Sequence, residues 1–392
     1  MAHRFGSHVP RRIRTILAGI AGILAVATVV ALVALWPSGE RRPDLSGLGF
    51  ISEVADAEVV AADDVPCQGQ PQEGVSCRRV TFELTTGPDA GELATQELVL
   101  TGTTPELEEG DRVVLARDPQ AAPEFRYRFV DRDRGAVLGW LAVAFVVAVV
   151  LLGGLRGITA LAGLAVSIAV LLTFTLPGIL EGRSPLAVAI VSSAAIAFLA
   201  LYLSHGFTTM TTVALLGTLA SLALVAALAQ LFVGLARLSG FASEEAIVVQ
   251  IGAANVDLAG IILGGVVIGA LGAIDDMTVT QASAVWELRA ADPRMGAAAL
   301  IRSGLRVGRD HIASTVNTLA LAYAGASMPV LLLLVLSRQS LATVANGEVI
   351  ATEILRTLVG SIGLVTAVPI TTWLASLAAP AAPEEALSRR PE

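Results

Sequence analysis

Lysine is missing from this chain of 392 residues, so all 26 of its fixed positive charges are arginines. The absence excludes chemistry that needs a lysine amine, such as Schiff-base formation, a Ser/Lys dyad or a P-loop. Charged residues are also scarce, at 15% of the chain against 54% hydrophobic residues. This balance excludes a disordered, collagen-like or nucleic-acid-coating protein. It predicts an integral membrane protein that is embedded in the lipid bilayer.

Long uncharged runs are the clearest feature that is present. A bilayer core about 30 Å thick needs about 20 apolar residues per helix. Eight runs approach that length: Ile16–Trp36, Val137–Leu155, Ile158–Leu176, Leu186–Ser204, Thr211–Leu235, Leu258–Ile274, Ala313–Leu336 and Leu358–Leu377. We therefore expect an α-helical polytopic membrane protein, with an anchor helix over residues 16–36 and a seven-helix bundle over residues 137–377.

Arginines in the short connecting segments predict the orientation. Four of them precede the first run, which by the positive-inside rule places residues 1–15 in the cytoplasm. After eight crossings the tail over residues 378–392 lies there too, and the bilayer is the cytoplasmic membrane. A cleaved signal peptide is the alternative for the first run, but its 21 residues exceed the roughly 7–15 of a signal-peptide core and favour a retained anchor.

The segment between the first two runs, residues 37–136, has a different composition. It holds 20 of the 34 acidic residues and 10 arginines, a net charge of −10, whereas the rest of the chain carries +2. Apolar and polar residues alternate in five places, which indicates short strands. These are Val54–Val60, Arg79–Thr85, Gln96–Thr101, Arg112–Ala116 and Phe125–Phe129. We expect a small β-rich domain outside the bilayer, an OB-like barrel or a sandwich.

Cys67 and Cys77 are the only cysteines, and both lie in this outer segment. Outside the cytoplasm we expect them to form a disulfide, with two unpaired thiols as the alternative. No histidine lies near them, so they give no case for a zinc site. The sequence does not identify any metal.

Polar residues at membrane depth are costly, so those that persist are the best indicators of function. Asn255 and Asp257 precede the sixth run, and Asp275 and Asp276 follow it, with Gln281 a short way beyond. An acid at a helix start caps backbone N–H groups, which accounts for one of the two adjacent acids but not for both. Capping and a role in binding a cation or a proton therefore both remain open.

The seventh run begins with a polar stripe. Asp310, Ser314 and Asn317 recur at helical spacing, and His311 begins a parallel row one residue later. Such a stripe should face the bundle interior or a wet cavity, unless it only supplies interhelical hydrogen bonds. Because both acid clusters flank one loop, we expect them to converge.

Arginines and one acidic residue form two further groups at helical spacing. Arg302, Arg306 and Arg309 follow the i, i+4, i+7 pattern, and at the cytoplasmic surface they are expected to contact anionic lipid headgroups. Glu353 and Arg356 are three residues apart and can pair on one helix face.

Three of these polar blocks carry a family resemblance: Gly269–Gln281 (GALGAIDDMTVTQ), Gly308–Leu319 (GRDHIASTVNTL) and Arg356–Gly363 (RTLVGSIG). In content and order they resemble the signature segments of the YibE/F-like family of bacterial multi-pass membrane proteins, over roughly residues 137–377. The resemblance implies a multi-pass membrane protein, and an outer domain after the first span is similar to the longer members. It implies no catalytic residue.

Two functions remain open. The first is a transporter or permease with a cytoplasm-facing polar site. The alternative is a non-transporting envelope assembly or sensing protein whose outer domain binds a protein partner. Because the chain lacks Gly-x-Ser-x-Gly, His-Glu-x-x-His and Cys-x-x-Cys motifs, we do not expect an enzyme, and no cofactor is indicated.

Overall fold

The computed structural model describes residues 11–39, 53–67, 76–102, 104–253, 255–336 and 340–379. Most of the expected N-terminal segment 1–15 and of the expected tail 378–392 lies outside the described residues. The chain divides into two compact units. We call Asp44–Val149 the sheet unit, and Met1–Pro43 together with Val150–Glu392 the helical unit.

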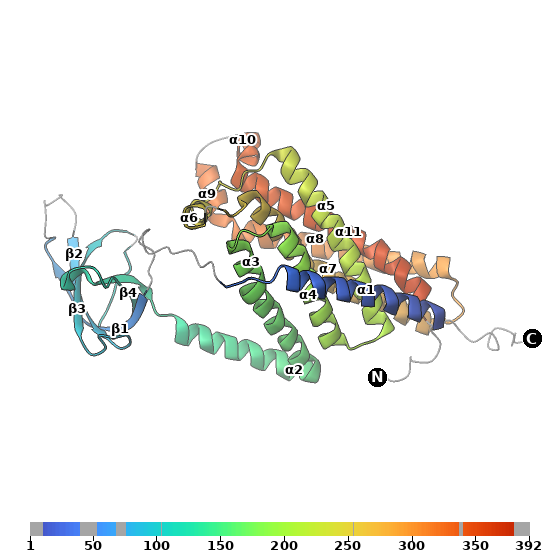
Figure 1. The fold of residues 1–392 in the computed structure, drawn as a ribbon, viewed down its shortest axis with the longest axis horizontal. Helices are drawn as coiled ribbons and strands as arrows, with labels where there is room; N and C mark the ends of the chain where they lie inside the picture. The colour runs from blue at the N-terminus through green and yellow to red at the C-terminus, as the bar shows by residue number, and fades with distance from the viewer. Residues whose placement is uncertain are drawn as a thin grey trace, which may run out of the picture. The chain divides into compact units, whose positions relative to one another are not determined.

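The sheet unit contains five antiparallel strands, which correspond to the five predicted segments. They are β1 (Glu53–Val65), β2 (Ser76–Leu84), β3 (Leu93–Leu100), β4 (Arg112–Arg117) and β5 (Tyr127–Arg132), with a short helix η2 (Pro123–Phe125) before the last. The strand order is β3-β2-β1-β4-β5 (Figure 1). The long strand β1 is therefore central and pairs with both β2 and β4.

The sheet curls until its two edge strands approach each other. The backbone N–H of Phe129 on β5 donates to Oε1 of Gln96 on β3 at 2.7 Å. Phe82 and Phe129 stack inside, with ring centroids 6.5 Å apart. The core is made by alternate residues of the strands, as the period of two predicts. Its buried members are Ala55, Ala57, Val59, Val80, Phe82, Leu84, Leu107, Val113 and Leu115.

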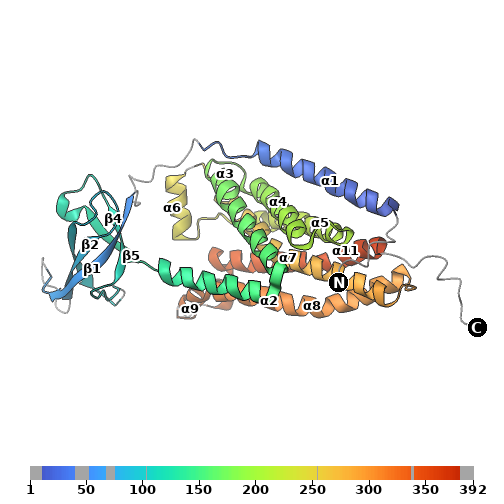
Figure 2. The same cartoon turned by 90° about the horizontal axis from the view of Figure 1, so that it is seen from below.

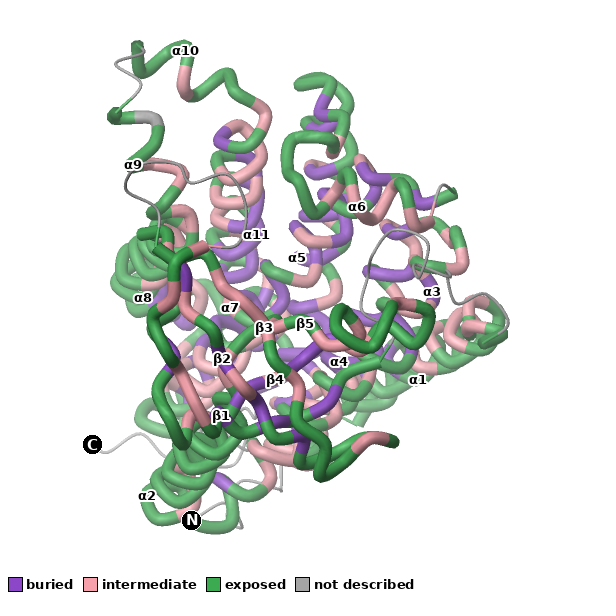
Figure 3. Tube along the Cα trace, turned by 90° about the vertical axis from the view of Figure 1, so that its left-hand side faces the viewer, coloured by how far each residue is buried: buried purple, intermediate pink, exposed green. Residues whose placement is uncertain are grey.

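The helical unit is organised around one long helix, α7. Its helices begin with α1 (Arg11–Ala34), α2 (Gly135–Val170), α3 (Leu176–Leu180), α4 (Pro185–His205), α5 (Thr209–Ala236) and α6 (Glu244–Gly252), and α2 starts in the sheet unit. They continue with α7 (Leu258–Ala291), α8 (Ala297–Ala326), α9 (Met328–Leu336), α10 (Leu341–Asn346) and α11 (Glu348–Ala378). Four helices, α4, α5, α8 and α11, pack on α7. Buried residues concentrate in α4, α5, α7 and α11 (Figure 3).

The first helix is bound to the rest of the helical unit at its C-terminal end. Glu181, after α3, accepts hydrogen bonds from the backbone N–H groups of Ser38 and Gly39 at 2.9 and 2.8 Å. Arg183 donates to the carbonyl oxygens of Ala34 and Trp36. Helix α1 lies along α4 and α5, on the side of the unit opposite α8 (Figure 2).

Six helical segments of the described residues are long and apolar enough to cross a membrane, which supports the prediction of a membrane protein. They are Arg11–Ala34, Gly135–Leu180, Pro185–His205, Thr209–Ala236, Leu258–Ala291 and Glu348–Ala378. The expected runs 137–155 and 158–176 both fall within Gly135–Leu180, where Gly154 has a non-helical φ of 57°. The expected run 313–336 is divided between α8 and α9, because Ser327 ends α8.

Candidate functional site

Asp275 and Asp276 lie in the middle of α7. The sequence analysis placed them at the start of a new helix after the sixth run and left capping open as the role of one of them. That placement is wrong, because α7 continues without a break from Leu258 to Ala291. A residue inside a helix has no free backbone N–H group to cap, so helix capping explains neither acid.

Burial differs between the two acids. Asp276 is exposed on the surface of α7, whereas Asp275 is half-buried. Oxygen Oδ1 of Asp275 is fully buried and has no hydrogen-bond partner in the described part of the chain. Near it, Thr278 bonds to Thr218 of α5 at 2.7 Å and donates to the backbone oxygen of Asp275 at 3.0 Å. The Asp275 carboxyl group therefore has one buried oxygen that no described residue satisfies.

His205 is an ionisable residue that the sequence analysis did not connect with this acidic pair. It ends α4, and the charges of Arg156 and Asp276 both act on it. Charged groups of α2 and α7 thus lie within electrostatic range of the end of α4. Sequence spacing gives no signal for this, because the residues are separated by 49 and 71 positions.

Gln281 has a structural role that its burial explains. Its side chain is only 2% exposed. Its Nε2 group donates to the carbonyl oxygen of Gly304 on α8 at 2.8 Å and to Oγ1 of Thr372 on α11 at 2.7 Å. Both amide hydrogens are therefore used, and the side chain joins three helices. Gly308, opposite Oε1, leaves the space that the amide needs.

Asp310, His311 and Asn317 do not join the acidic pair. All three are exposed on α8. Within the described residues no hydrogen bond or ion pair connects them to Asp275 or Asp276. The reason lies in the packing of α8, whose buried residues Leu300, Gly304 and Gly308 occupy the inner face. The polar stripe is left on the opposite face, and the expected convergence is absent.

Glu353 and Arg356 form an ion pair on α11, with Nη1 and Oε1 2.6 Å apart. The guanidinium group also lies 5.8 Å from the ring centroid of Tyr323 on α8, a cation–π distance. Glycines of α7 make room for both side chains. A Cβ at Gly265 would lie 3.5 Å from Arg356, and one at Gly269 would lie 2.7 Å from the Tyr323 hydroxyl. Because each charge has a partner, we assign this cluster to packing.

The remaining candidates have local roles or none that the structure assigns. Asp257 caps α7 by accepting from the N–H group of Gly260 at 3.0 Å. Asn255 lies in the loop before α7, against Gly182. The side chains of Arg302, Arg306 and Arg309 are exposed on α8, and contact with lipid headgroups stays a prediction.

The helical unit contains two cavities that do not include the acidic pair. One of about 250 Å³ lies between α8, α9 and α11 beside Tyr323 and Glu353 and is almost wholly apolar. The other, of about 490 Å³, lies between α1 and the ends of α4 and α5, where it is lined by Arg14, Tyr202 and Thr212 among others.

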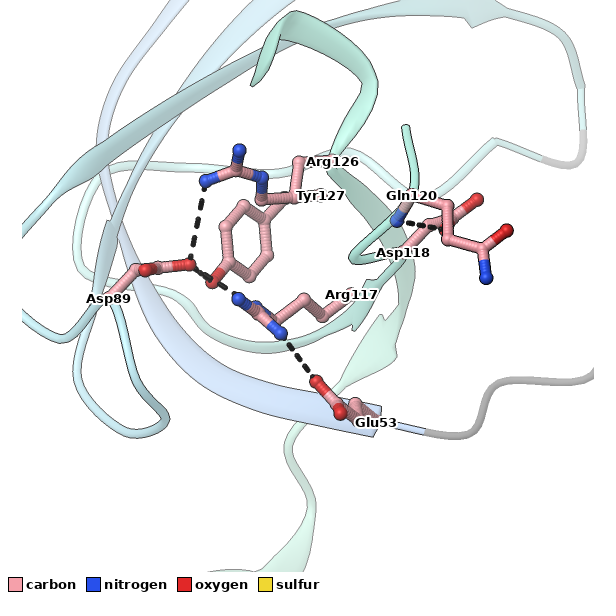
Figure 4. A network of polar contacts seen from close by, with 7 residues as sticks. All are labelled: Glu53, Asp89, Arg117, Asp118, Gln120, Arg126 and Tyr127. Carbon is pink, nitrogen blue, oxygen red and sulfur yellow. Dashed lines mark hydrogen bonds and ion pairs between the residues drawn. The ribbon is translucent and has the colours of Figure 1, made fainter. Parts of the chain in front are cut away.

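The sheet unit has a polar network of its own (Figure 4). Asp89 accepts hydrogen bonds from the Tyr127 hydroxyl at 2.6 Å and from Arg117 Nε at 3.2 Å, and Arg126 approaches it to 4.0 Å. Arg117 also pairs with Glu53 at 2.6 Å. The Tyr127 hydrogen bond, followed by the two arginines, lowers the pKa of Asp89. The network ties β1, β4, β5 and the β2–β3 loop together.

Cys67 and Cys77 are bonded to each other beside the pairing of β1 with β2. The Glu97 carboxylate lies close enough to both sulfur atoms for the three side chains to resemble a metal-binding group. Two sulfurs joined in a disulfide are not thiolates, however, so this group does not have the ligands that a metal needs.

The comparisons with known proteins give one match. A family model described as YibE/F-like protein matches residues 141–381, which is more than half of the chain. No curated protein and no solved structure matches this chain. The matched region contains the central helix α7, its neighbours and all three of the polar blocks that carry the resemblance. The chain therefore belongs to the YibE/F-like protein family.

Proposed function

We propose that this chain is a transporter of the permease kind in the cytoplasmic membrane, and that Asp275 and Asp276 bind its coupling proton or cation. One observation carries the proposal: two adjacent acids lie midway along a continuous apolar helix, and one oxygen of Asp275 is buried with no partner. Ionisable groups at membrane depth are costly, and in membrane proteins they commonly mark ion pathways and proton relays.

The surroundings of the pair support a carrier role better than a packing role. Two adjacent carboxylates repel each other, and a shared proton or a bound cation relieves that repulsion. Both amide hydrogens of Gln281 are used, and the charges of Glu353 and Arg356 pair with each other, whereas the Asp275 carboxylate has no cation paired with it among the described residues.

The proposal includes eight crossings with both termini in the cytoplasm. Gly135–Leu180 contains 46 residues, about 69 Å of helix, which is enough for two crossings that turn at Gly154. The eighth crossing combines the C-terminal part of α8 with α9. The four arginines before Ile16 support this orientation, which puts the sheet unit on the extracytoplasmic side of the membrane.

The test is proton movement by the full-length protein in liposomes. A pH-sensitive dye trapped inside the liposomes reports proton flux. A gradient of Na⁺, K⁺, Mg²⁺ or Mn²⁺ across the liposome membrane is applied in turn to drive that flux. We expect proton flux above that of protein-free liposomes with at least one cation. The double variant Asp275→Asn with Asp276→Asn should lose it, because an amide cannot carry the proton.

Asp257→Asn is the matched control. It removes an acid from the same helix, and asparagine caps a helix about as well as aspartate does. This variant should keep the wild-type flux. The transport proposal is wrong if no gradient drives proton movement, or if the double variant moves protons as fast as the wild type.

A role in envelope assembly or sensing is the second candidate, and it is supported by the separate core of the sheet unit. Strand order β3-β2-β1-β4-β5 with approaching edges is also that of an OB-like barrel opened between β3 and β5. Barrels of this kind bind ligands with one face and their loops. Two results together would favour this role: deletion of residues 53–132 abolishes the function of the protein in cells, and the full-length protein shows no proton flux in liposomes.

A further inference from the structure

Helix α8 has two faces of opposite character. Its inner face packs through Gly304 and Gly308 on α7 and α11. Its outer face is exposed along the edge of the helical unit (Figures 2 and 3). We call the exposed polar residues of this outer face the α8 stripe: Asp310, His311, Ser314, Asn317 and Thr318.

The α8 stripe lies at the depth of the apolar helices. Leu319 packs on Gly360 of α11, where an added Cβ would come within 3.4 Å of it. Gly360 is 12 residues, about 18 Å, from the start of α11, which is itself long and apolar enough to span a membrane. Asn317, two residues before Leu319, is therefore level with the interior of that helix and not with its end.

A polar stripe at this depth needs a polar neighbour. Lipid tails offer no hydrogen bonds, and an amide exposed to them is left unsatisfied. The Asn317 side chain makes no hydrogen bond to any described residue, and the described helices that pack most on α8, α7 and α11, lie against its other face. In the membrane the α8 stripe therefore lacks a polar neighbour among the described residues.

We infer that a second copy of this chain covers it, and that two α8 stripes pack together about a two-fold axis. The stripe is self-complementary: Asn317 both donates and accepts, Asp310 accepts, and His311 and the adjacent Arg309 donate. Ser314, Thr318 and Ala322 are exposed and spaced four residues apart, which lets two helices approach closely. Charge and shape therefore both fit an identical partner.

The contact changes the role of the α8 residues. They pair across the dimer and do not complete the Asp275 site of their own chain. The inference does not depend on the transport proposal, since it rests on the depth, the exposure and the self-complementarity of the α8 stripe. A protein that moves no protons would still dimerise in this way.

Cysteine cross-linking in native membranes tests the contact. The two natural cysteines are bonded to each other, so one added cysteine is the sole free thiol of the chain. Ser314→Cys changes one exposed atom of the α8 stripe and should give a disulfide-linked dimer on mild oxidation. Ala223→Cys is the matched control, because Ala223 is exposed on α5 two residues from Val225, which packs on Gly363 of α11.

We expect dimer from Ser314→Cys and at most a trace from Ala223→Cys. Equal cross-linking of the two variants indicates random collision, and a product containing another protein indicates a different partner. Either result overturns the inference, as does the absence of any cross-linked product from Ser314→Cys.

A second measurement follows the strength of the contact without oxidation. The dimer fraction of fluorescently labelled protein in liposomes can be counted by single-molecule photobleaching. Asn317→Leu removes the central amide from both copies and should raise the dissociation constant roughly threefold to tenfold. Leu319 and Gly360 are untouched, so the fold is kept. A wild-type protein that bleaches only in single steps contradicts the inference.

Discussion

Single glycines decide which side chains can meet inside the helical unit. Gly265 and Gly269 of α7 make room for Arg356 and Tyr323, and Gly308 of α8 makes room for Gln281. The sequence by itself gives no means to find the partners of the two α7 glycines. Those partners are large polar side chains that come from two other helices. They fit against α7 because glycine has no side chain at these positions.

Substitution of Gly308 tests this at the residue scale. A Cβ there would collide with Val368 and lie 2.8 Å from Oε1 of Gln281. Gly308→Ala should therefore lower the free energy of unfolding of the helical unit by about 1–3 kcal/mol. Thermal unfolding of the purified full chain in detergent, followed by tryptophan fluorescence, measures the loss.

Gly272→Ala is the control for this prediction. Gly272 also lies inside a long helix, but nothing lies within 4 Å of a Cβ built on it. Alanine favours helix over glycine by up to about 1 kcal/mol, so this variant should be neutral or stabilising. Equal unfolding temperatures for the two variants would show that the close approach at Gly308 is relaxed by its neighbours.

At the scale of elements, polar side chains in the sheet unit join strands and a loop that the backbone hydrogen bonds of the sheet do not connect. The β2–β3 loop reaches β4 and β5 through Asp89, and Arg117 reaches β1 through Glu53. The sequence analysis found the strands from their alternation but missed this network. Its members are separated by up to 74 positions, and each alone resembles an ordinary surface charge.

The network should make the sheet unit sensitive to acid. The pKa of Asp89 lies below its ordinary value of 3.8, mainly because Tyr127 and then Arg117 bond to its charged form. Its contribution to stability is therefore complete above that ordinary value and disappears as pH falls through the lower folded-state pKa. Hydrogen exchange of β4 and β5 in the full chain, corrected for intrinsic rates, should report weaker protection as pH falls through this range.

Asp89→Asn should reduce that protection at pH 7 and flatten its dependence on acid. Asp118→Asn is the comparison, because the Asp118 side chain accepts a local hydrogen bond from the backbone of Gln120, which asparagine can also accept. A profile in which Asp89→Asn follows the wild type at every pH would remove Asp89 from the acid response.

At the scale of the whole molecule, the chain contains separate hydrophobic cores in its two units. The core of the sheet unit includes no residue of the helical unit, and the clusters of the helical unit include none from the strands. Each unit should therefore respond to its own substitutions. The disulfide gives a way to perturb one of them alone.

Replacement of both Cys67 and Cys77 by serine should destabilise the sheet unit by roughly 2–3 kcal/mol, because the link closes a short loop in the unfolded chain. Hydrogen exchange should quicken in β1 and β2, and the unfolding temperature of the helical unit should stay within error of the wild type. A parallel loss of protection in α7 and α11 would indicate that the two units fold as one.

The sequence by itself determined the membrane character, the family, the strands and the positions worth testing. These follow from local patterns: the length of apolar runs, a period of two, and short blocks of polar residues. It misjudged α7, because a pair of acids resembles the end of a helix when its neighbours are unseen. An acid inside a helix is tolerated there only because of what surrounds it.

Only the tertiary structure decided which polar residues have partners. Gln281 is satisfied by Gly304 and Thr372, whereas one oxygen of Asp275 is not satisfied at all. The direction of the α8 stripe was also beyond the sequence. A helix turns its best-packing face inward, and Gly304 and Gly308 make that face by fitting against α7 and α11. Close packing of α8 on α7 and α11, whose residues lie far away in the sequence, therefore leaves the polar face of α8 exposed.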